Sequence, residues 1–381
     1  MRKLEAGIRR VRFAALLLAG GCAWGGIAGA AQARDRDGRV VTVMTRNVYI
    51  GTDLDPIFAA GNLEALLSAT ATAFGNVEAT DFPARAQALA GEIAASQPDL
   101  VGLQEVEIIR TGPVADPAPA TTVSGDYLSL LLAALEDRGL EYTPVAVNVN
   151  ADVEVPSALG LDVRATDRDV ILARGRVRRK IRRVQEQNFS TNLTLQVLGR
   201  QITILRGWSA VDVKLRGRRV RFVNTHLEPS SSAVQVAQAN ELLAGPADTR
   251  LPLIFLGDFN SPAEGTGSPT YANLLAAEFA DAWSQAEPGA AGPTCCHASN
   301  LLNGLPTLDR RIDLVLLRGG QGRRGPLVAR SAEVVGDDPG DKLGPSGLWP
   351  SDHAGVVARL RPADRRGRLR HRGWRASSRR P

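Results

Sequence analysis

One segment of the chain combines an apolar stretch with two polar side chains that can do chemistry. Residues 251–256 are apolar, as is typical of a buried strand, and Gly257 follows them. Asp258 and Asn260 come next, two positions apart, a spacing that directs both side chains to the same side of an extended chain. A carboxylate and an amide there could hold a metal or a water together with a substrate oxygen. The alternative is an ordinary turn that closes the strand.

Polar side chains recur at the ends of the other expected strands. Besides Asp258 and Asn260, they are Asn47, Glu105, His226, Asp313, Asp352 and His353. Because burying unpaired charge is costly, repeated strand ends of this kind indicate a shared site rather than packing. The chemistry that requires carboxylates, amides and imidazoles together is metal-assisted hydrolysis of a phosphate ester.

The oxygen-bearing side chains have expected roles in such hydrolysis. Glu105 is expected to be the first ligand of a hard cation, Mg²⁺ or else Mn²⁺ or Ca²⁺, which prefers oxygen ligands. Asp258 is expected to orient or deprotonate the attacking water. Asn47 and Asn260 are expected to hold phosphate oxygens or to complete the surroundings of the metal.

The histidines are the expected proton carriers. His353 could act as acid, base or phosphate contact near neutral pH, with Asp313 fixing its tautomer. His226 is a second proton carrier, suited to the leaving oxygen. The alternatives are a satisfied core histidine for His226, a structural carboxylate for Glu105, and a plain ion pair between Asp313 and Arg311.

Composition is that of a soluble globular protein of one large domain or two smaller ones. The chain has 381 residues, of which 44% are hydrophobic. Residues 1–33 and 361–381 are strongly basic, so the formal net charge of +6 belongs to the ends and the part between them is acidic. The overall charge is therefore poor evidence that the body of the protein binds nucleic acid.

The first 33 residues are typical of an export signal. Arginines up to Arg12 precede an apolar stretch, and Ala31-Gln32-Ala33 fits a cleavage site. We therefore expect a secreted or periplasmic protein that has lost residues 1–33. A lipoprotein anchored at Cys22 is the alternative, and Arg9-Arg10 would suit a twin-arginine export route.

Cleavage near residue 33 would leave Cys295 and Cys296 as the cysteines of the mature chain. Export would permit a disulfide. The two cysteines could bridge to each other, pair between chains or remain free. With His297 beside them, they do not indicate a zinc site.

The order of expected elements favours one layered α/β domain over residues 34–360, followed by a disordered basic tail at 361–381. Strands are expected at 40–49, 99–106, 169–173, 193–198, 201–205, 210–215, 220–225, 251–256, 311–316 and 355–360. Helices are expected at 63–67, 82–96, 127–135, 233–244 and 269–282, and surface loops at 110–125, 292–307 and 319–325. An arginine-rich cluster at 174–183 is either a solvated strand pair or a rim that attracts phosphate.

Six short motifs, taken in order, resemble those of the endonuclease/exonuclease/phosphatase superfamily, and they span nearly all of the chain beyond the signal. They are Thr45-Arg46-Asn47-Val48, Leu103-Gln104-Glu105, Asn224-Thr225-His226-Leu227-Glu228, Gly257-Asp258-Phe259-Asn260, Arg311-Ile312-Asp313-Leu314-Val315 and Ser351-Asp352-His353. The chain is most similar to exported bacterial members in which a Thr-Cys-Cys segment, here Thr294-Cys295-Cys296, precedes the Arg-Ile-Asp strand.

The resemblance implies a four-layered α/β sandwich, in which two facing mixed β-sheets are flanked by helices. It also implies a divalent metal at Glu105 and acid–base work by two histidines. The implied supporting set is Asn47, Asp258 and Asp352 at the metal, Asn260 and Asp313 in catalysis, and Asn47 and Arg206 at the substrate phosphate. Asp169, or its rival Asp167, would match the acidic partner of His226, and Tyr142 is a loose match to a phosphate-contacting tyrosine.

The leading hypothesis is an exported, metal-dependent phosphoesterase of the phosphodiesterase or endonuclease type. We expect a monomer without an obligate protein partner, acting on a nucleic acid, a phospholipid headgroup or a small phosphate ester. A sphingomyelinase-like phospholipid phosphodiesterase and a phosphomonoesterase are the alternatives. A binding module that reuses the fold without catalysis is a more remote one, because fold alone does not prove chemistry.

Overall fold

The computed structural model describes residues 40–321 and 326–363. Contacts divide the chain into Met1–Arg36 and Asp37–Pro381, and all described residues belong to the second unit. The expected signal peptide, nearly all of the expected tail, and residues 322–325 of the expected loop at 319–325 lie outside the described residues. Within the described part, no helix is long and apolar enough to span a membrane.

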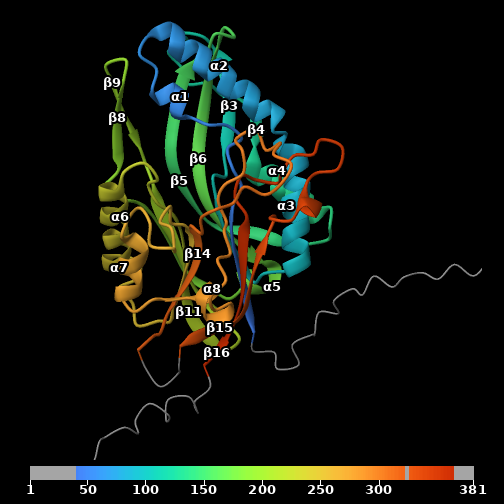
Figure 1. Ribbon diagram of the computed structural model, residues 1–381, viewed down its shortest axis with the longest axis vertical. Coiled ribbons are helices and arrows are strands. Elements are labelled where there is room, and N and C mark those ends of the chain that lie inside the picture. The colour runs from blue at the N-terminus through green and yellow to red at the C-terminus, as the bar shows by residue number, and fades with distance from the viewer. Residues whose placement is uncertain (1–39, 322–325, 364–381) are drawn as a thin grey trace, which may run out of the picture. The chain divides into compact units, whose positions relative to one another are not determined.

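The described chain forms two large sheets and a separate hairpin (Figure 1). The first sheet has the order β15 (Leu327–Val335), β16 (Gly355–Pro362), β1 (Val41–Asn47), β2 (Leu100–Gln104), β6 (Leu161–Arg174), β3 (Ile108–Pro113) and β4 (Thr122–Asp126), with β5 (Tyr142–Pro156) also paired to β6. The second has the order β13 (Ala280–Asp281), β14 (Asp313–Arg318), β12 (Leu253–Asp258), β11 (Arg218–His226), β10 (Gly207–Leu215) and β7 (Ile181–Asn188). The hairpin pairs β8 (Leu193–Val197) with β9 (Arg200–Ile204).

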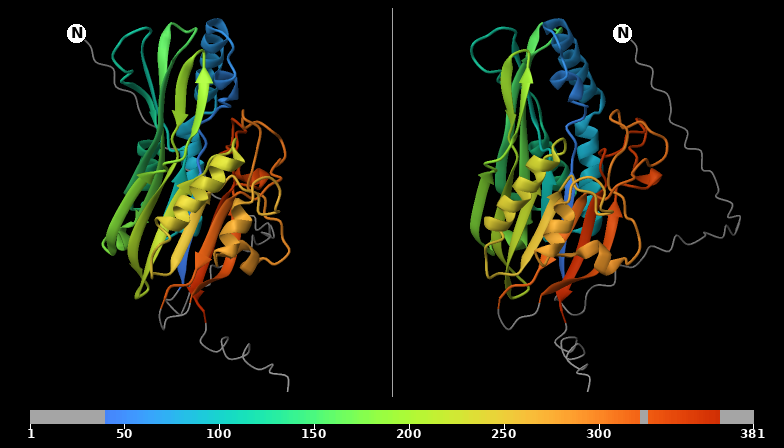
Figure 2. Two further views of the ribbon diagram at one scale, coloured as in Figure 1. Left: turned by 90° about the vertical axis from the view of Figure 1, so that its left-hand side faces the viewer. Right: turned by 60° about the vertical axis from the view of Figure 1, so that its left-hand side comes forward.

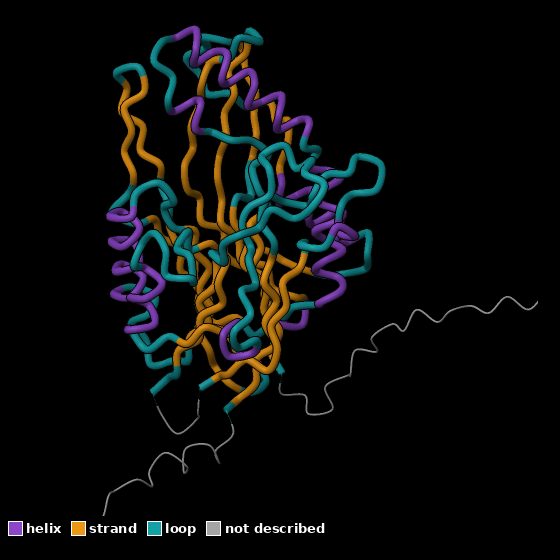
Figure 3. Tube along the Cα trace, in the orientation of Figure 1, coloured by secondary structure: helices purple, strands orange, loops and turns teal. Residues whose placement is uncertain are grey.

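Helices flank the strands on both sides (Figures 2 and 3). They are α1 (Asp55–Phe58), α2 (Leu63–Ala79), α3 (Phe82–Ser96), α4 (Tyr127–Glu136), α5 (Gly175–Arg178), α6 (Ser232–Ala244), α7 (Thr270–Ala276) and α8 (Ala282–Ala286), with a short 3-10 helix at Pro339–Asp341. One apolar core joins α2, α3 and α4 to the first sheet, a second lies between the sheets, and a third joins α6 and α7 to the second sheet. The four-layered α/β sandwich is thereby confirmed.

Strand β1 shows how alternation builds these layers. Val41 and Val43 belong to the core between the sheets, whereas Met44 packs into the core under α3. Successive side chains of a strand point to opposite faces, so a strand buried on both faces reads as a nearly continuous apolar run. The expected strand at 40–49 is confirmed in its central part.

The two sheets approach each other closely at Gly102. A Cβ atom on Gly102 of β2 would lie 2.2 Å from Leu256 Cδ1 and 2.5 Å from Asn224 Oδ1, so this close approach requires glycine. Asn224 donates from Nδ2 to the carbonyl of Leu103 at 3.0 Å and accepts from Gln104 Nε2 at 2.7 Å. These buried bonds fix the second sheet against the first.

Several expected elements were wrong in type or extent. Residues 110–125 are not a surface loop, because β3 and β4 pair with each other there and β3 also pairs with β6. The strand β15 was not predicted at all. Both β3 and β15 are half-exposed and lack clean alternation, so only their long-range pairing defines them.

Two helix predictions also needed correction. The expected helix at 63–67 continues to Ala79 through a stretch of alanine and threonine with little apolar periodicity. The expected helix at 269–282 ends at Ala276, because Glu278 adopts a φ of 67° and the chain then pairs with β14. The helix at 82–96 is confirmed over Phe82–Ser96, since the cap at Asp81 and helical spacing both mark it.

The loop at 292–307 carries a buried histidine with a testable pH effect. The His297 ring stacks on Trp349 at a centroid distance of 3.9 Å, and its Nδ1 lies 3.0 Å from Asn303 Nδ2. Burial lowers the pKa of His297 to about 4. The unfolded chain, with an imidazole pKa near about 6.5, therefore binds the proton first as the pH falls.

The stabilisation from neutral His297 is fully present above about pH 6.5 and is lost progressively down to about pH 4. We expect wild-type protein to lose about 2 kcal/mol of unfolding free energy by this route between pH 7 and 4.5. A His297→Phe variant keeps a ring on Trp349 but binds no proton, so it should lose less. Urea unfolding at the two pH values measures this, and equal losses in both proteins would contradict it.

Candidate active site

The site lies where strands of both sheets end or begin at one edge of the sandwich. Register brings its residues together: Asp258 at the end of β12 is paired with His226 on one side and Asp313 on the other. In the first sheet, Asn47 at the end of β1 is paired with Gln104, directly before Glu105. His353 comes two residues before β16, which pairs with β1.

Special backbone conformations shape the site. Gly257 has a φ of 145°, and a Cβ atom there would lie 1.9 Å from the carbonyl oxygen of Thr225. Glu105 and Asn260 have φ values of 56° and 48°, in the left-handed region that is uncommon for residues other than glycine. Such strained positions cluster at functional sites, where the surrounding structure holds them in place.

The turn after β12 accounts for the spacing of Asp258 and Asn260. The Oδ1 atom of Asp258 accepts a hydrogen bond from the backbone nitrogen of Asn260 at 2.9 Å. The Nδ2 atom of Asn260 donates to the carbonyl of Leu227 at 3.0 Å. The turn interpretation is therefore correct, and it also frees Asp258 Oδ2 to face the site.

Asp258 Oδ2 is the point on which both sheets converge. It lies 3.2 Å from Asn47 Nδ2, 3.4 Å from His226 Nε2 and 3.8 Å from His353 Nε2. Asp258 is 1% exposed. Burial raises the pKa of Asp258 to about 7, which suits a carboxylate that takes up and releases a proton near neutrality.

His353 and Asp313 form a buried pair. His353 Nδ1 lies 2.8 Å from Asp313 Oδ2, and Nε2 faces Asp258. Burial works to lower the pKa of His353, but the carboxylates of Asp313, Asp352 and Asp258 together raise it well above its ordinary value. His353 is therefore positively charged at neutral pH, with a hydrogen on each ring nitrogen. Its Nε2 is the atom that can donate a proton toward Asp258.

The segment that carries His353 is fixed to β1. Ser351 Oγ donates to the carbonyl of Asn47 at 2.8 Å, and Arg46 Nη1 donates to the carbonyl of His353. Arg46 is itself buried in an ion pair with Glu92 at 2.9 Å. These bonds explain why the first and last motifs of the chain act as a unit.

His226 is held differently from His353. Arg206 Nη1 lies 2.8 Å from His226 Nδ1, and because a guanidinium only donates, this ring nitrogen accepts. Burial lowers the pKa of His226 well below its ordinary value, and the charges of Arg206 and His353 lower it further. His226 is therefore neutral with its hydrogen on Nε2, facing Asp258, and this geometry disfavours the proton-carrier role expected for it.

The expected carboxylate partner of His226 is replaced by Arg206. Arg206 Nη1 also lies 3.3 Å from Asp167 Oδ2, so the arginine stands between that carboxylate and the histidine. Asp169 instead accepts from Asn150 Nδ2 at 3.0 Å. Neither Asp169 nor Asp167 thus takes the partner position expected from the resemblance.

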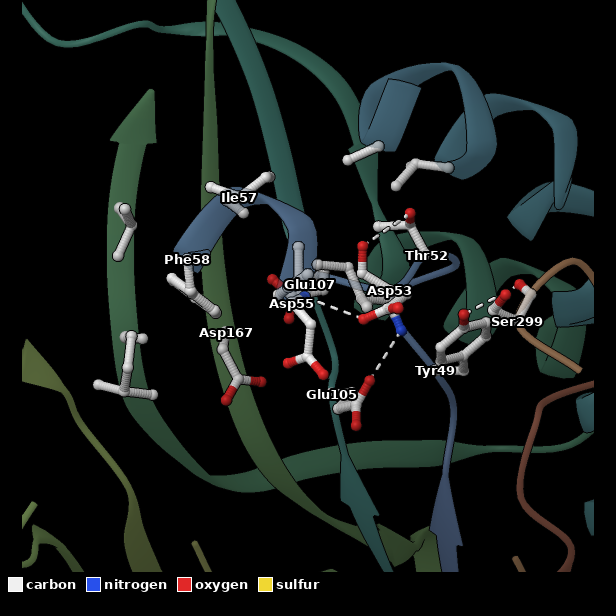
Figure 4. Close-up of a pocket in the computed structure, with 18 of the residues that line it drawn as sticks. Tyr49, Thr52, Asp53, Asp55, Ile57, Phe58, Glu105, Glu107, Asp167 and Ser299 are labelled. Carbon is white, nitrogen blue, oxygen red and sulfur yellow. Dashed lines mark hydrogen bonds between the residues drawn. The ribbon is translucent and has the colours of Figure 1, made fainter. Parts of the chain in front are cut away.

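Glu105 faces a cavity of about 720 Å³ together with Arg206 and Asp352 (Figure 4). Its carboxylate accepts from Asn47 Nδ2 at 2.9 Å and from the backbone nitrogen of Ile50 at 2.9 Å. Asn47 thus presents its amide nitrogen to Glu105 and Asp258. In this arrangement Asn47 positions the carboxylates and does not direct its oxygen to a metal.

Sequence reasoning missed Asn150 of β5, which bonds to the carboxylates of Asp167 and Asp169 on β6. Asn150 donates to both Asp167 Oδ2 and Asp169 Oδ2, at 3.2 and 3.0 Å. The alternation of Asp167 and Asp169 on one strand face was the available signal for a polar cluster. Tyr142 donates to the carbonyl of Pro98 and packs in the core under α4, so it does not contact the site.

The two cysteines bond to each other. Cys295 and Cys296 form a disulfide, and Cys296 Sγ lies 4.0 Å from His353 Nε2.

The arginine-rich segment at 174–183 lies at the end of the second sheet that is away from the site. Strand β10 pairs with Ile181 of β7 near one of its ends and with His226 of β11 at the other. The cluster therefore does not form a rim of this site.

Comparisons with known proteins agree with this arrangement. The model of the endonuclease/exonuclease/phosphatase family matches residues 62–353. No curated protein matches the chain. The fold and the arrangement of the site define a protein with the phosphoesterase fold of this family. The chain belongs to the endonuclease/exonuclease/phosphatase family.

Solved structures show the same fold at low identity. An endonuclease/exonuclease/phosphatase protein of Beutenbergia cavernae is 21% identical with a TM-score of 0.50, covering 85% of this chain and 72% of that one. A family protein of Bacteroides thetaiotaomicron is 17% identical with a TM-score of 0.51, covering 85% and 98%. The mannosyl-6-phosphatase of the same species is 18% identical with a TM-score of 0.50, covering 84% and 99%.

Members of the family typically use a divalent metal, and the residues of this site fit one. Asp258 and Asp313 are buried and offer carboxylate oxygens, which lie with a ring nitrogen of His353 within 4.8 Å of one another. Because a protonated imidazole has no free lone pair, the carboxylates are the available ligands of this group. Asp313 Oδ1 is buried without a hydrogen-bond partner among the described residues. Glu105 and Asp352 add carboxylates nearby, and such an oxygen-rich, negatively charged set suits a hard cation.

Proposed function

We propose that this protein is an exported phosphodiesterase that depends on a divalent cation, with Mg²⁺ as the first choice and Mn²⁺ or Ca²⁺ as substitutes. The observation that carries the proposal is the approach of Asp258, with a pKa of about 7, to the protonated pair of His353 and Asp313. An acceptor and a donor of protons thus face each other beside the cavity. Hydrolysis of a phosphate ester requires both.

Each residue of the site has a separate role in hydrolysis. Asp258 Oδ2 orients the attacking water and accepts its proton as the water oxygen bonds to phosphorus, while Nε2 of His353 donates a proton to the leaving oxygen, so that the alcohol departs as its P–O bond breaks. Neutral His226 contributes its Nε2–H as a fixed donor, and Arg206 supplies positive charge at the cavity. Glu105, with Asp352, would hold the cation, positioned by Asn47. When bound, the cation would polarise the phosphoryl oxygen and offset developing charge.

Export and a monomeric state remain part of the proposal. The disulfide between Cys295 and Cys296 supports an oxidising compartment, since such bonds are rare in the cytosol. The position of the arginine-rich segment, away from the site, removes one argument for nucleic acid as the substrate. A phosphomonoesterase or a phospholipid phosphodiesterase would use the same groups, and a substrate panel separates them.

The test is hydrolysis by the purified chain from Arg34 onward, with bis(4-nitrophenyl) phosphate, 4-nitrophenyl phosphate, plasmid DNA and sphingomyelin in parallel. We expect turnover of the diester with Mg²⁺, none after EDTA treatment, and recovery when Mg²⁺ is returned. An Asp258→Asn variant keeps the shape of the side chain and should lose about 10²-fold or more in kcat. Diester turnover that needs neither metal nor Asp258 would refute the proposal.

The panel also decides between the alternatives. Preferred cleavage of the monoester would change the assignment to a phosphomonoesterase, and headgroup release from sphingomyelin to a phospholipase. No turnover of any substrate by a folded protein would favour the binding module.

A further inference from the structure

The cavity at Glu105 continues beyond the groups that hydrolysis uses. Its remaining walls come from α1, α2 and the long pair β5–β6, and their side chains are largely apolar. We call this part the apolar arm and define it by Ile57, Phe58, Phe74, Val153 and Val163. Figure 4 shows Ile57 and Phe58 on α1 directly above the side chains of Glu105, Glu107 and Asp167.

The walls of the apolar arm are held by packing and are not loose surface. Ile57 of α1 belongs to a buried cluster with Leu66 of α2 and Val197 of β8. The turn between β5 and β6 is bonded to α2, where Ala158 N donates to the carbonyl of Leu67 at 3.0 Å. The space is therefore preformed, as is usual for sites that take small molecules, and its volume lies in their ordinary range.

Charge in the cavity disfavours a polyanionic strand. Among the described residues that line it, the carboxylates of Asp53, Asp55, Glu105, Glu107, Asp167 and Asp352 outnumber the guanidinium groups of Arg206 and Arg310. This excess of negative charge would repel a chain of phosphate groups.

Resting on the proposed hydrolysis of a phosphate ester, we propose that the apolar arm binds the alcohol part of the substrate. That part is an apolar group. The substrate class is then an amphiphilic phosphate ester, with its phosphate at Arg206 and its chain between α1–α2 and β5–β6. Val153 and Val163 become residues that determine specificity without touching the phosphate.

Binding of phosphonates tests the arm independently of turnover, because their P–C bond is not hydrolysed. We expect isothermal titration of the Mg²⁺-loaded chain to give an affinity at least about 100-fold higher for octylphosphonate than for methylphosphonate, since a buried methylene typically adds about fourfold and burying about four of the extra methylenes suffices. A Val153→Phe variant fills the arm and should weaken octylphosphonate about tenfold or more without changing methylphosphonate. Val149→Phe, on the same strand but outside the cavity and 49% exposed, is the matched control.

Equal affinities for the two phosphonates, or equal effects of the two phenylalanine variants, would overturn the inference. If Val153→Phe does not fold by circular dichroism, Val163→Phe takes its place.

The same protein separates this inference from the proposed function. Hydrolysis of bis(4-nitrophenyl) phosphate without any preference for octylphosphonate would leave the phosphodiesterase standing and refute the arm. A preference for octylphosphonate that Val153→Phe abolishes, in a chain that hydrolyses nothing, would support the arm and refute the phosphodiesterase.

Discussion

Replacing His353 with alanine is expected to lower kcat for diester hydrolysis by about 10³-fold, within the range that one positioned proton donor contributes. His353 is 6% exposed, and its Nε2 is the protonated atom that faces Asp258. Alanine removes that donor and leaves no side chain to replace it. The measurement is steady-state kinetics at saturating Mg²⁺, with thermal unfolding as the check that the fold is retained.

The matched control is His297→Ala, which removes another buried imidazole, that of a residue lining the cavity at Glu105. It should leave kcat within a few-fold of wild type. If both variants lost activity equally, the loss at His353 would reflect damage to the cavity and not a missing proton donor.

Asp313 acts through His353, and the pH dependence of kcat tests this role. As a general acid His353 must be protonated, so the rate falls when the pH rises through its pKa. The carboxylate of Asp313 contributes to the high pKa of His353. In Asp313→Asn the alkaline limb of the kcat profile should therefore move to lower pH, whereas a purely structural loss would lower the profile without moving it.

The site residues could be predicted because they belong to short local motifs at strand ends. In Gly257-Asp258-Phe259-Asn260, one glycine and one turn determine the local shape, and both are visible in the chain. The α3 prediction succeeded for a similar reason, since its apolar periodicity is a local signal. Such local features can be recognised without knowing which strands pair with each other.

The neutral state of His226 could not be predicted in that way. It depends on Arg206, which reaches Nδ1 only because Gly207 of β10 pairs with His226 of β11. The strands β3, β4 and β15 were missed because their residues are largely half-exposed or exposed and lack clean alternation, so only their pairing, such as that of β3 with β6, defines them. The apolar arm likewise combines side chains from α1, α2, β5 and β6 that share no motif. Long-range register, which local patterns do not encode, decides these features.

Replacing Glu105 with glutamine is expected to weaken the binding of the divalent cation. Glu105 has both oxygens fixed, by Asn47 Nδ2 and by the backbone nitrogen of Ile50, and it faces the cavity. Glutamine keeps the size but loses the charge, so we expect about 10³-fold lower kcat/KM at fixed Mg²⁺. Titration calorimetry should show at least about 100-fold weaker Mg²⁺ binding, because hard cations depend on carboxylate charge.

Stability gives a second readout that does not depend on turnover. Without metal, two effects of Glu105→Gln oppose each other. The variant removes a charge that repels Asp258, Asp313 and Asp352, but its single amide oxygen can accept only one of the hydrogen bonds from Asn47 and Ile50, so the two proteins should unfold at similar temperatures. A ligand at about 100 times its Kd stabilises the native state by about 2.7 kcal/mol, which wild type gains from Mg²⁺ and the variant does not. The melting temperature of wild type should therefore rise above that of the variant when Mg²⁺ is added.

Glu107→Gln is the control for this effect of Mg²⁺, because Glu107 lies two residues further along the chain and is more deeply buried. It should keep the stabilisation by Mg²⁺, since Glu107 has no assigned contact with the cation. Loss of the metal effect in both variants would place the cation between Glu105 and Glu107. Loss in neither would move it to the buried carboxylates of Asp258 and Asp313, which lie with a ring nitrogen of His353 within 4.8 Å of one another.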